Sequence, residues 1–186
     1  QLIGRGCGNF LAYGVFDLED GVAEHEKRKR FLEGGTTTRE LAYAALDVGK
    51  ITEDVTRSWF NGEVRHPSNG VTEPNPDKDG GYSWLKAPRY DGKPHEVGPL
   101  ARLMVAYAAG NQKVRTLLQP YLDQLGISGA DLPSVAGRHL ARALETKLVA
   151  DAMVDWLLDL DVDEPAAIPV EVPEEGEGYG ITEAPR

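Results

Sequence analysis

The chain has 186 residues, of which 41% are hydrophobic and 27% are charged, a composition typical of one globular domain or two small ones. Thirty Asp and Glu against twenty Lys and Arg give a formal net charge of −10, which argues against sequence-independent binding of nucleic acid. No apolar run approaches the roughly 20 residues of a transmembrane helix. A single cysteine excludes an internal disulfide framework or a zinc ribbon.

In the N-terminal part, hydrophobic residues alternate with small ones. Residues 10–16 predict a short, mostly buried strand that follows a glycine-rich turn, and the charged residues 19–30 are expected at the surface. Residues 51–60 predict one or two turns of helix, with Thr52 as the N-cap. Proline, asparagine and glycine over residues 61–81 predict a long loop.

Three amphipathic helices are predicted in the second half, because apolar residues recur there at helical spacing. The first begins at Pro99, where the missing N–H of proline costs nothing, and runs to Gly110. The second ends at Gly126 after a kink at a proline, and the third is capped by Asp131 or Ser134.

These elements predict an α-rich α+β fold, with a helix-dominated body and short strands. Three prolines and many acidic residues predict an extended acidic connector over residues 161–175. The sequence begins at Gln1 without an export signal and ends on a glycine-rich turn at Arg186. Because such a turn normally leads into another element, we expect residues 1–186 to be a partial single domain from a longer protein.

Residues of the kinds that bind metals or nucleotides are sparse. Cys7 has no second soft ligand nearby and no CxxC pair, so a buried structural role is expected. None of the four histidines has a partner at i+4; His25 is expected to be solvated, and His66, before Pro67, to fix a turn. The glycine runs lack the strand and helix of a dinucleotide-binding motif.

Three charged residues have open interpretations. Glu96 precedes a helix start, where the dipole favours a carboxylate, and Arg102 lies one and a half turns further on. A capping glutamate and a surface arginine are the favoured interpretation, and an ion pair that orients helix and loop is the alternative. Arg186, held after a proline, could stabilise a developing negative charge in a dry site or could equally be solvated.

Several stretches, in this order, resemble the large catalytic subunit of nickel–iron (NiFe) hydrogenases. Together YSWLKAPRY, EVGPLAR and TEAPR are specific, whereas any one of them alone would be weak. The matching stretches are residues 8–16, 58–60, 66–67, 70–75, 82–90, 96–102, 137–138, 141–142 with Glu145, and 180–186.

The resemblance implies a subunit that holds a Ni–Fe centre with CO and cyanide ligands, Ni-Fe(CN)2CO, and a magnesium ion, and that cleaves H2 heterolytically. Electrons would pass to an iron–sulfur small subunit in a heterodimer. In that family two CxxC pairs ligate the metals, and this sequence has neither. We therefore expect no metal ligand within this segment, Cys7 included, and we expect the segment alone to bind no metal and to be inactive.

The resemblance also assigns residues. The arginine of the family's EAPR motif matches Arg186, whose guanidinium would lie over the open side of the metal pair, and Pro185 would line the same pocket. Lys86 resembles a lysine near a magnesium-linked network. Glu96 and Arg102 would be scaffold around the buried centre.

The resemblance further implies H2 as substrate, no nucleic-acid partner and no membrane span of its own. The protein would be cytoplasmic, or periplasmic or membrane-associated through a partner subunit. The alternative is a metal-free relative that acts as an interaction module or as a quinone-reductase-like subunit. The CxxC pairs separate these hypotheses, since a metal-free relative lacks one or both of them.

Overall fold

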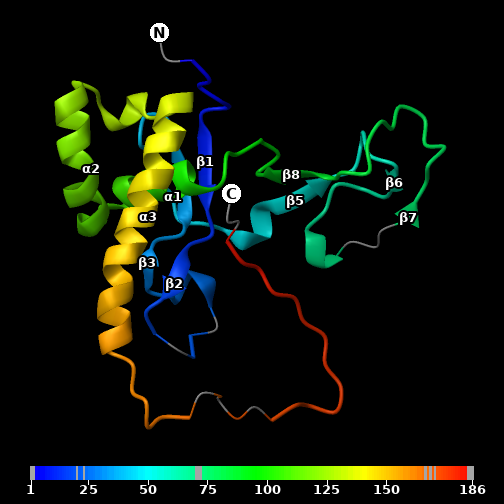
Figure 1. The fold of residues 1–186 in the computed structure, drawn as a ribbon. Coiled ribbons are helices and arrows are strands. Elements are labelled where there is room, and N and C mark those ends of the chain that lie inside the picture. Colours follow the sequence, from blue (N-terminus) through cyan, green and yellow to red (C-terminus); the bar gives the residue numbers. More distant parts are fainter. Residues whose placement is uncertain are drawn as a thin grey trace.

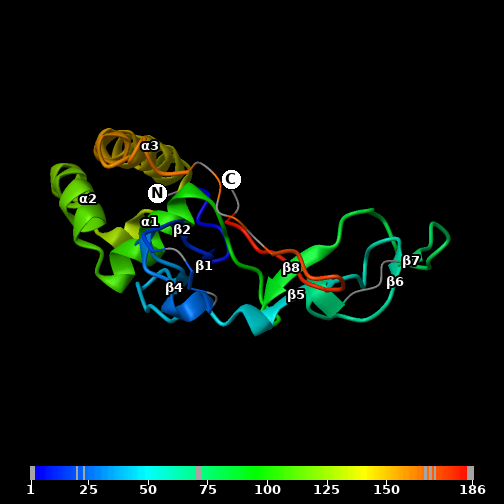
Figure 2. The ribbon, with the colours of Figure 1, turned by 90° about the horizontal axis from the view of Figure 1, so that it is seen from below.

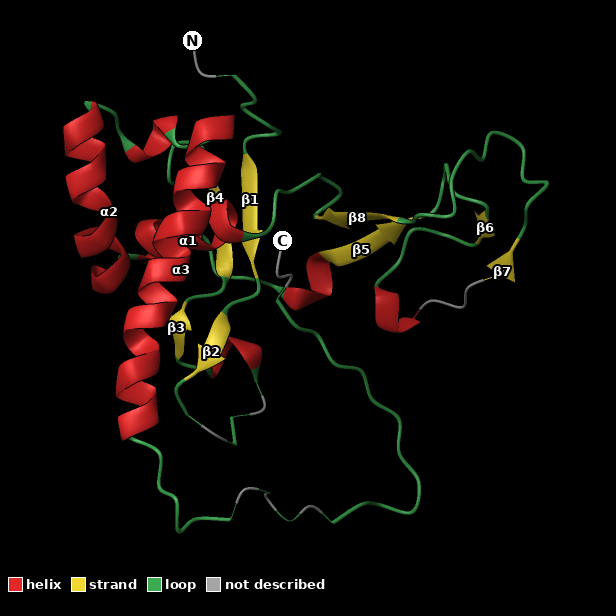
Figure 3. Cartoon of the chain, in the orientation of Figure 1, coloured by secondary structure: helices red, strands yellow, loops and turns green. Residues whose placement is uncertain are grey.

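The structure is a computed structural model that describes residues 3–19, 21–22, 24–69, 73–165, 167, 169 and 171–183. Figure 1 shows a helical body, an arm of short strands beside it, and a long C-terminal segment that leaves the body, reaches the arm and comes back. Figure 3 shows the same division by secondary structure: the three α-helices lie in the body, the arm has only short helical turns, and strands occur in both parts.

Helix α1 (Pro99–Ala109) lies at the centre of the body and packs against α2 (Gln112–Leu125), α3 (Val135–Leu158) and the first strands. The predicted helix boundaries are confirmed: Gly110 and Gly126 are left-handed C-caps, and the Ser134 hydroxyl accepts a hydrogen bond from the N–H of the third residue of α3. Asp131 belongs to a separate 3-10 turn (Gly129–Asp131), where its carboxylate accepts a hydrogen bond from the N–H of the N-cap residue Ser128, and α2 continues through its proline.

Burial of α1 goes further than its pattern predicts. All residues from Pro99 to Ala106 are buried, so the helix is enclosed on every side instead of presenting one apolar face. Its single charged residue, Arg102, is 5% exposed. A guanidinium in that position requires partners within the protein, because burial of an unpaired charge is very unfavourable.

Two small antiparallel sheets complete the body. Strand β1 (Asn9–Ala12) pairs with β4 (Gly35–Thr38), and β2 (Val15–Asp17) pairs with β3 (Arg30–Leu32). The single strand predicted over residues 10–16 is therefore two strands, separated by a corner at Tyr13–Gly14. The surface position predicted for residues 19–30 is wrong for Arg30, which is 8% exposed at the start of β3.

Glycine is required at this corner. Gly14 has a φ of +97°, which side chains rarely adopt. A Cβ there would lie 2.8 Å from the backbone nitrogen of Gly34 and 2.6 Å from the side chain of Arg30. The corner can therefore pack closely on β3 only without a side chain.

The arm consists of β5 (Ile51–Asp54) paired with β8 (Ala87–Tyr90) and β6 (Phe60–Asn61) paired with β7 (Glu73–Pro74), both antiparallel. The helix predicted over residues 51–60 is wrong, and Thr52 lies in a strand. The β-branched start of β5 suits a strand once a distant partner is available, and local sequence does not reveal that partner. The described residues of the predicted loop, 61–69 and 73–81, are irregular apart from the end of β6, the strand β7 and one 3-10 turn.

The described residues thus form an α+β fold with three α-helices and four two-stranded sheets. Strands and irregular segments make up a larger share of the chain than the prediction of a helix-dominated body implies. In the same residues, no helix combines the length and the apolar character that crossing a membrane would need.

The C-terminal segment contacts both parts of the fold. At the described positions between 159 and 183 it forms no helix or strand, and Figures 1 and 2 show it as a long loop that runs out below the body and the arm and then turns back. The ring of Tyr179 packs against His66 in the arm, with centroids 5.4 Å apart. The segment then returns to the body at Glu183, which is 9% exposed.

The first turn of α3 provides a test of this packing. In Gly137→Ala, the new Cβ would lie 1.8 Å from the carbonyl oxygen of Leu132, so the backbone of the turn would have to move. We expect the free energy of unfolding to fall by at least the 1–3 kcal/mol, roughly, that overpacking costs. Urea unfolding measures it, and Gly178→Ala, where a Cβ meets nothing within 4 Å, is the control. Equal unfolding curves for the two variants would contradict the close approach.

Candidate functional site

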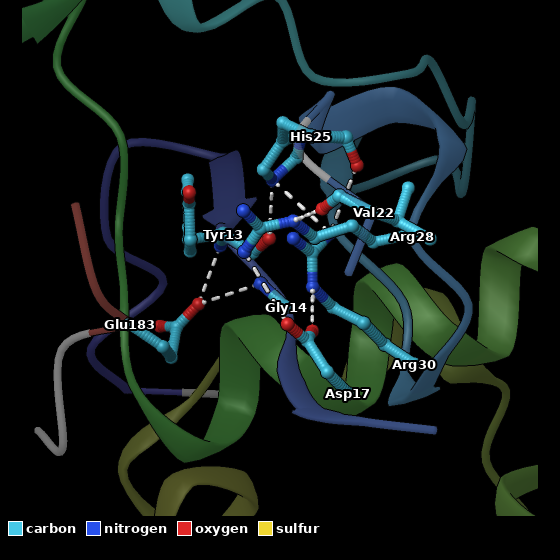
Figure 4. Close-up of polar contacts among 8 residues, drawn as sticks. All are labelled: Tyr13, Gly14, Asp17, Val22, His25, Arg28, Arg30 and Glu183. Atoms are coloured by element: carbon cyan, nitrogen blue, oxygen red, sulfur yellow. Dashed lines mark hydrogen bonds and ion pairs between the residues drawn. The ribbon is translucent and has the colours of Figure 1, made fainter. Parts of the chain in front are cut away.

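Glu183 joins the C-terminal segment to the body. Its Oε2 accepts hydrogen bonds from the backbone N–H groups of Tyr13 and Gly14, the latter at 3.1 Å, and its Oε1 lies 3.4 Å from Nη1 of Arg102. Figure 4 shows the carboxylate directed at the corner between β1 and β2. We call Glu183, Arg102, Glu145 and the Tyr13–Gly14 corner the Glu183 anchor.

Arg102 is held by a second carboxylate. Its Nε and Nη2 donate to the two oxygens of Glu145 on α3, with 2.7 Å between Nη2 and Oε2. The two side chains are 7% and 14% exposed. Burial lowers the pKa of Arg102, but the hydrogen bonds and charges of Glu145 and Glu183 outweigh it and raise the pKa above its ordinary value. Arg102 therefore stays charged and links α1, α3 and the C-terminal segment.

The other side of the corner is held by His25. Its Nε2 lies 2.8 Å from the carbonyl oxygen of Tyr13, which can only accept a hydrogen bond, and 3.2 Å from Nη1 of Arg30; the Tyr13 and His25 rings pack 4.3 Å apart. Arg30, whose side chain is 4% exposed, pairs with Asp17 at 2.8 Å and lies over the Tyr13 ring. The backbone of the corner is thus bonded on both sides, and the solvated position predicted for His25 is wrong.

The protonation state of His25 follows from these contacts. Burial lowers its pKa, the hydrogen bond to the Tyr13 carbonyl opposes this, and the positive charges of Arg30 and Arg28 lower it further. The net shift is downward, so the ring is neutral at pH values where a free histidine is already charged.

A cavity of about 500 Å³ lies beside the anchor. Arg102, Glu145 and Glu183 form its polar side, and its apolar side comes from β2 and from the second half of α3. The cavity therefore places a buried ionic group next to an apolar wall, a combination common in binding and catalytic sites.

A second ion pair connects the segment just before α1 with α3. Arg138 donates from Nε and Nη2 to the two oxygens of Glu96, at 2.5 and 2.6 Å. The hydrogen bond with Glu96 raises the pKa of Arg138 above its ordinary value, although burial opposes it. Glu96 is thus the partner of α3 and not a cap, since Gly98 occupies the N-cap position of α1.

These contacts decide between the interpretations of Glu96 and Arg102. The surface position favoured for Arg102 is wrong, and so is the ion pair between the two residues, because each is paired with a residue of α3. Lys86 belongs to the arm, where its Nζ lies 2.7 Å from Glu53 and over the ring of Phe60. The structure therefore places Lys86, Glu96 and Arg102 in three separate ion pairs.

Two predicted site residues, Pro185 and Arg186, lie outside the described residues. Cys7 is exposed, so the buried position predicted for it is wrong; its glycine-rich surroundings do not form part of the core. Among the residues that the structure describes, no group of three or more His, Cys, Asp or Glu could hold a metal ion. Their donor set does not fit a Ni–Fe centre by itself.

Sequence reasoning missed the partners that complete the site. Glu183 was available as part of TEAPR and Glu145 as part of another matching stretch, but neither has a spacing that predicts an ion pair with Arg102, because the partners lie 81 and 43 residues away. The glycine at position 14 was the one local signal for the corner, since a lone glycine in a strand pattern indicates a bend.

The whole chain, residues 1–186, matches the family model of nickel-dependent hydrogenase, and the chain therefore belongs to that family. Among curated relatives, the periplasmic NiFeSe hydrogenase large subunit of Desulfomicrobium baculatum is 37% identical over 194 residues, which cover 98% of this chain and 36% of the relative. The Hydrogenase-1 large chain of Escherichia coli is 30% identical over 225 residues, covering 99% of this chain and 36% of the relative.

Solved structures agree. The NiFeSe hydrogenase of Dm. baculatum superposes with a TM-score of 0.78 at 36% identity, over 98% of this chain and 38% of that chain. The Ni-Fe-Se hydrogenase of D. vulgaris Hildenborough gives 0.73 at 32% identity, over 92% of this chain and 36% of that chain. The chain thus spans little more than a third of the length of these large subunits.

The Arg102–Glu145 pair gives a stability prediction. Glu145→Gln removes a charge from a pair that is nearly enclosed, so the free energy of unfolding should fall by about 3 kcal/mol. Asp151→Asn is the control, because Asp151 pairs with Lys147 on an exposed face of the same helix and such pairs contribute only about 0.3–0.5 kcal/mol. Urea unfolding distinguishes the two values. An equal fall in the free energy of unfolding for both variants would show that the Arg102–Glu145 pair contributes no more than an exposed ion pair.

The lowered pKa of His25 predicts a pH dependence. Below its ordinary value of 6.5 the unfolded chain binds a proton that the folded chain does not, so stability falls as the pH drops from about 6.5 toward the lower, folded-state pKa. His25→Gln should remove this part of the slope in urea unfolding measured between pH 7.5 and 5.5. Replacement of the exposed His139 by Gln should leave the slope in place; a slope that survives in His25→Gln would assign it to another group.

Proposed function

We propose that this chain is a segment of the catalytic large subunit of a nickel–iron hydrogenase, which oxidises H2 or reduces protons and exchanges electrons with an iron–sulfur small subunit. The observation that carries the proposal is the family match along all 186 residues, supported by relatives named as hydrogenase large subunits and by the shared fold. The alternative of a metal-free relative has no comparable support among the named relatives.

We assign the metal ligands to other parts of the subunit. The chain has one cysteine, which is exposed, and its described residues contain no metal-binding group. The Ni–Fe centre with its CO and cyanide ligands, and the magnesium ion, would therefore be held by thiolates and other donors in the remaining two thirds of a subunit as long as its relatives. When bound, the centre supplies the redox chemistry of H2 cleavage.

This segment would contribute a cation and the framework that holds it. Arg186 would place a guanidinium where the H–H bond separates into unequal charges, and a fixed cation stabilises the negative charge that develops there. Pro185 would restrict the backbone beside it. Arg102 and Glu96 would act as framework through their pairs with α3, and Lys86, paired with Glu53, would support a magnesium-linked network from the arm.

The direct test uses the full-length subunit that carries this segment, produced together with its small subunit. We expect bound nickel and H2-dependent reduction of an artificial electron acceptor. A folded complex without nickel and without this activity would overturn the proposal in favour of the metal-free alternative, whose flanking sequences would lack one or both CxxC pairs.

In that complex, Arg186→Lys keeps the positive charge but loses the planar head with its fixed donors. We expect the nickel content to be unchanged and H2 turnover to fall by about 100-fold, the typical effect of removing one preorganised electrostatic group. Metal analysis and H2-dependent dye reduction measure the two quantities. Arg142→Lys, at an exposed position of α3, is the control and should keep full turnover. Wild-type turnover in Arg186→Lys would remove Arg186 from the mechanism.

A further inference from the structure

We propose that Glu183 is a positioning residue for Arg186: its buried carboxylate fixes the C-terminal segment to the body just before Pro185 and Arg186. The inference rests on the proposed function, and it assigns to Glu183 a role that neither its sequence motif nor the family match specifies. Arg102, Glu145 and the Tyr13–Gly14 corner are the parts of the body that hold it.

The first support is the distribution of burial along the segment. Of the described residues from 159 to 183, only Glu183 is buried, and all but Ile181 of the others are exposed. A long exposed stretch is thus attached to the body at one side chain, in addition to the peripheral contact of Tyr179 with the arm. The return of the chain to the body depends on the contacts of that carboxylate (Figures 1 and 4).

The second support is that the partners of Glu183 are all donors. One oxygen faces two backbone N–H groups and the other faces the guanidinium of Arg102. A carboxylate accepts on both sides, whereas a glutamine amide has one oxygen and must turn its NH2 group toward a donor. The site is therefore specific for a carboxylate, and the neutral isostere cannot satisfy it.

The third support is that the partners of Glu183 are themselves fixed. The corner is held from its other side by His25, and glycine at position 14 permits its close packing on β3. Arg102 is locked by the two-armed pair with Glu145, which leaves its Nη1 directed at Glu183. Because the anchor is built on rigid elements, it can hold the adjoining chain in a defined position, as precise placement of functional groups requires.

Covalent geometry then connects the anchor to Arg186. Three chain steps separate the two residues, so their Cα atoms lie at most about 11 Å apart. The proline between them reduces the accessible backbone conformations further. Fixing Glu183 therefore limits how far Arg186 can lie from the anchor, and displacement of a functional group by about 1 Å can cost roughly 100-fold in rate.

The test compares Glu183→Gln with Glu177→Gln, the same change at an exposed position of the same segment, in the full-length subunit with its small subunit. Hydrogen exchange, nickel content, and kcat and KM for H2 are measured. In Glu183→Gln we expect faster exchange at the Tyr13–Gly14 corner and in residues 176–186, unchanged nickel content, and a kcat lower by about 100-fold. Glu177→Gln should resemble the wild type in all four.

Other outcomes decide against the proposal. Unchanged exchange at the corner would show that Glu183 does not hold it, and loss of nickel with faster exchange throughout would indicate a general structural role. Glu183→Asp keeps both acceptor oxygens and should retain more turnover than Glu183→Gln; the reverse order would overturn the argument from donors. If the wild-type complex does not turn over H2, the proposed function fails, whereas faster exchange confined to Glu183→Gln still supports the anchor.

Discussion

The burial of Arg102 is the constraint on which the rest of the body depends. Helix α1 is enclosed by the other elements, and a charge inside it can be accommodated only by carboxylates from the segments packed around it. Glu145 provides one from α3, and Glu183 provides the other from the C-terminal segment. One buried guanidinium thus determines how a neighbouring helix and a distant chain segment lie against α1.

The corner between β1 and β2 has the complementary role, because it uses backbone groups where Arg102 uses a side chain. Its two N–H groups bind Glu183 and its Tyr13 carbonyl accepts from His25, so the peptide units are fixed from opposite sides. Backbone N–H groups carry no net charge, but their dipoles stabilise the second of the two carboxylates that share the single guanidinium of Arg102. The neutral ring of His25 suits this arrangement, since Arg30 and Arg28 already lie nearby.

The helices could be predicted from the sequence because their signals are local: Pro99 begins one, Ser134 caps another, and Gly126 ends a third. The strand β5 and the buried position of Arg102 could not, because both depend on partners far away in the chain. Motif resemblance led to the family, which the match along the chain confirms. The resemblance pointed to Glu96 and Arg102 as framework, and only the three-dimensional structure supplied Arg138, Glu145 and Glu183 as the residues they act with.

The two ion pairs between the α1 region and α3 also explain why these helices adopt one register. Glu96 meets Arg138, and Arg102 meets Glu145, so the order of charges is reversed on the two elements. Arg138 and Glu145 lie about two turns apart on α3, and a slip of that length would bring Arg102 against Arg138. Such a slip would bring two guanidinium groups together and separate each from its carboxylate, which is unfavourable. The same pairs that stabilise the packing therefore also disfavour this shifted register, and in the observed register Arg102 lies within reach of both Glu145 and Glu183.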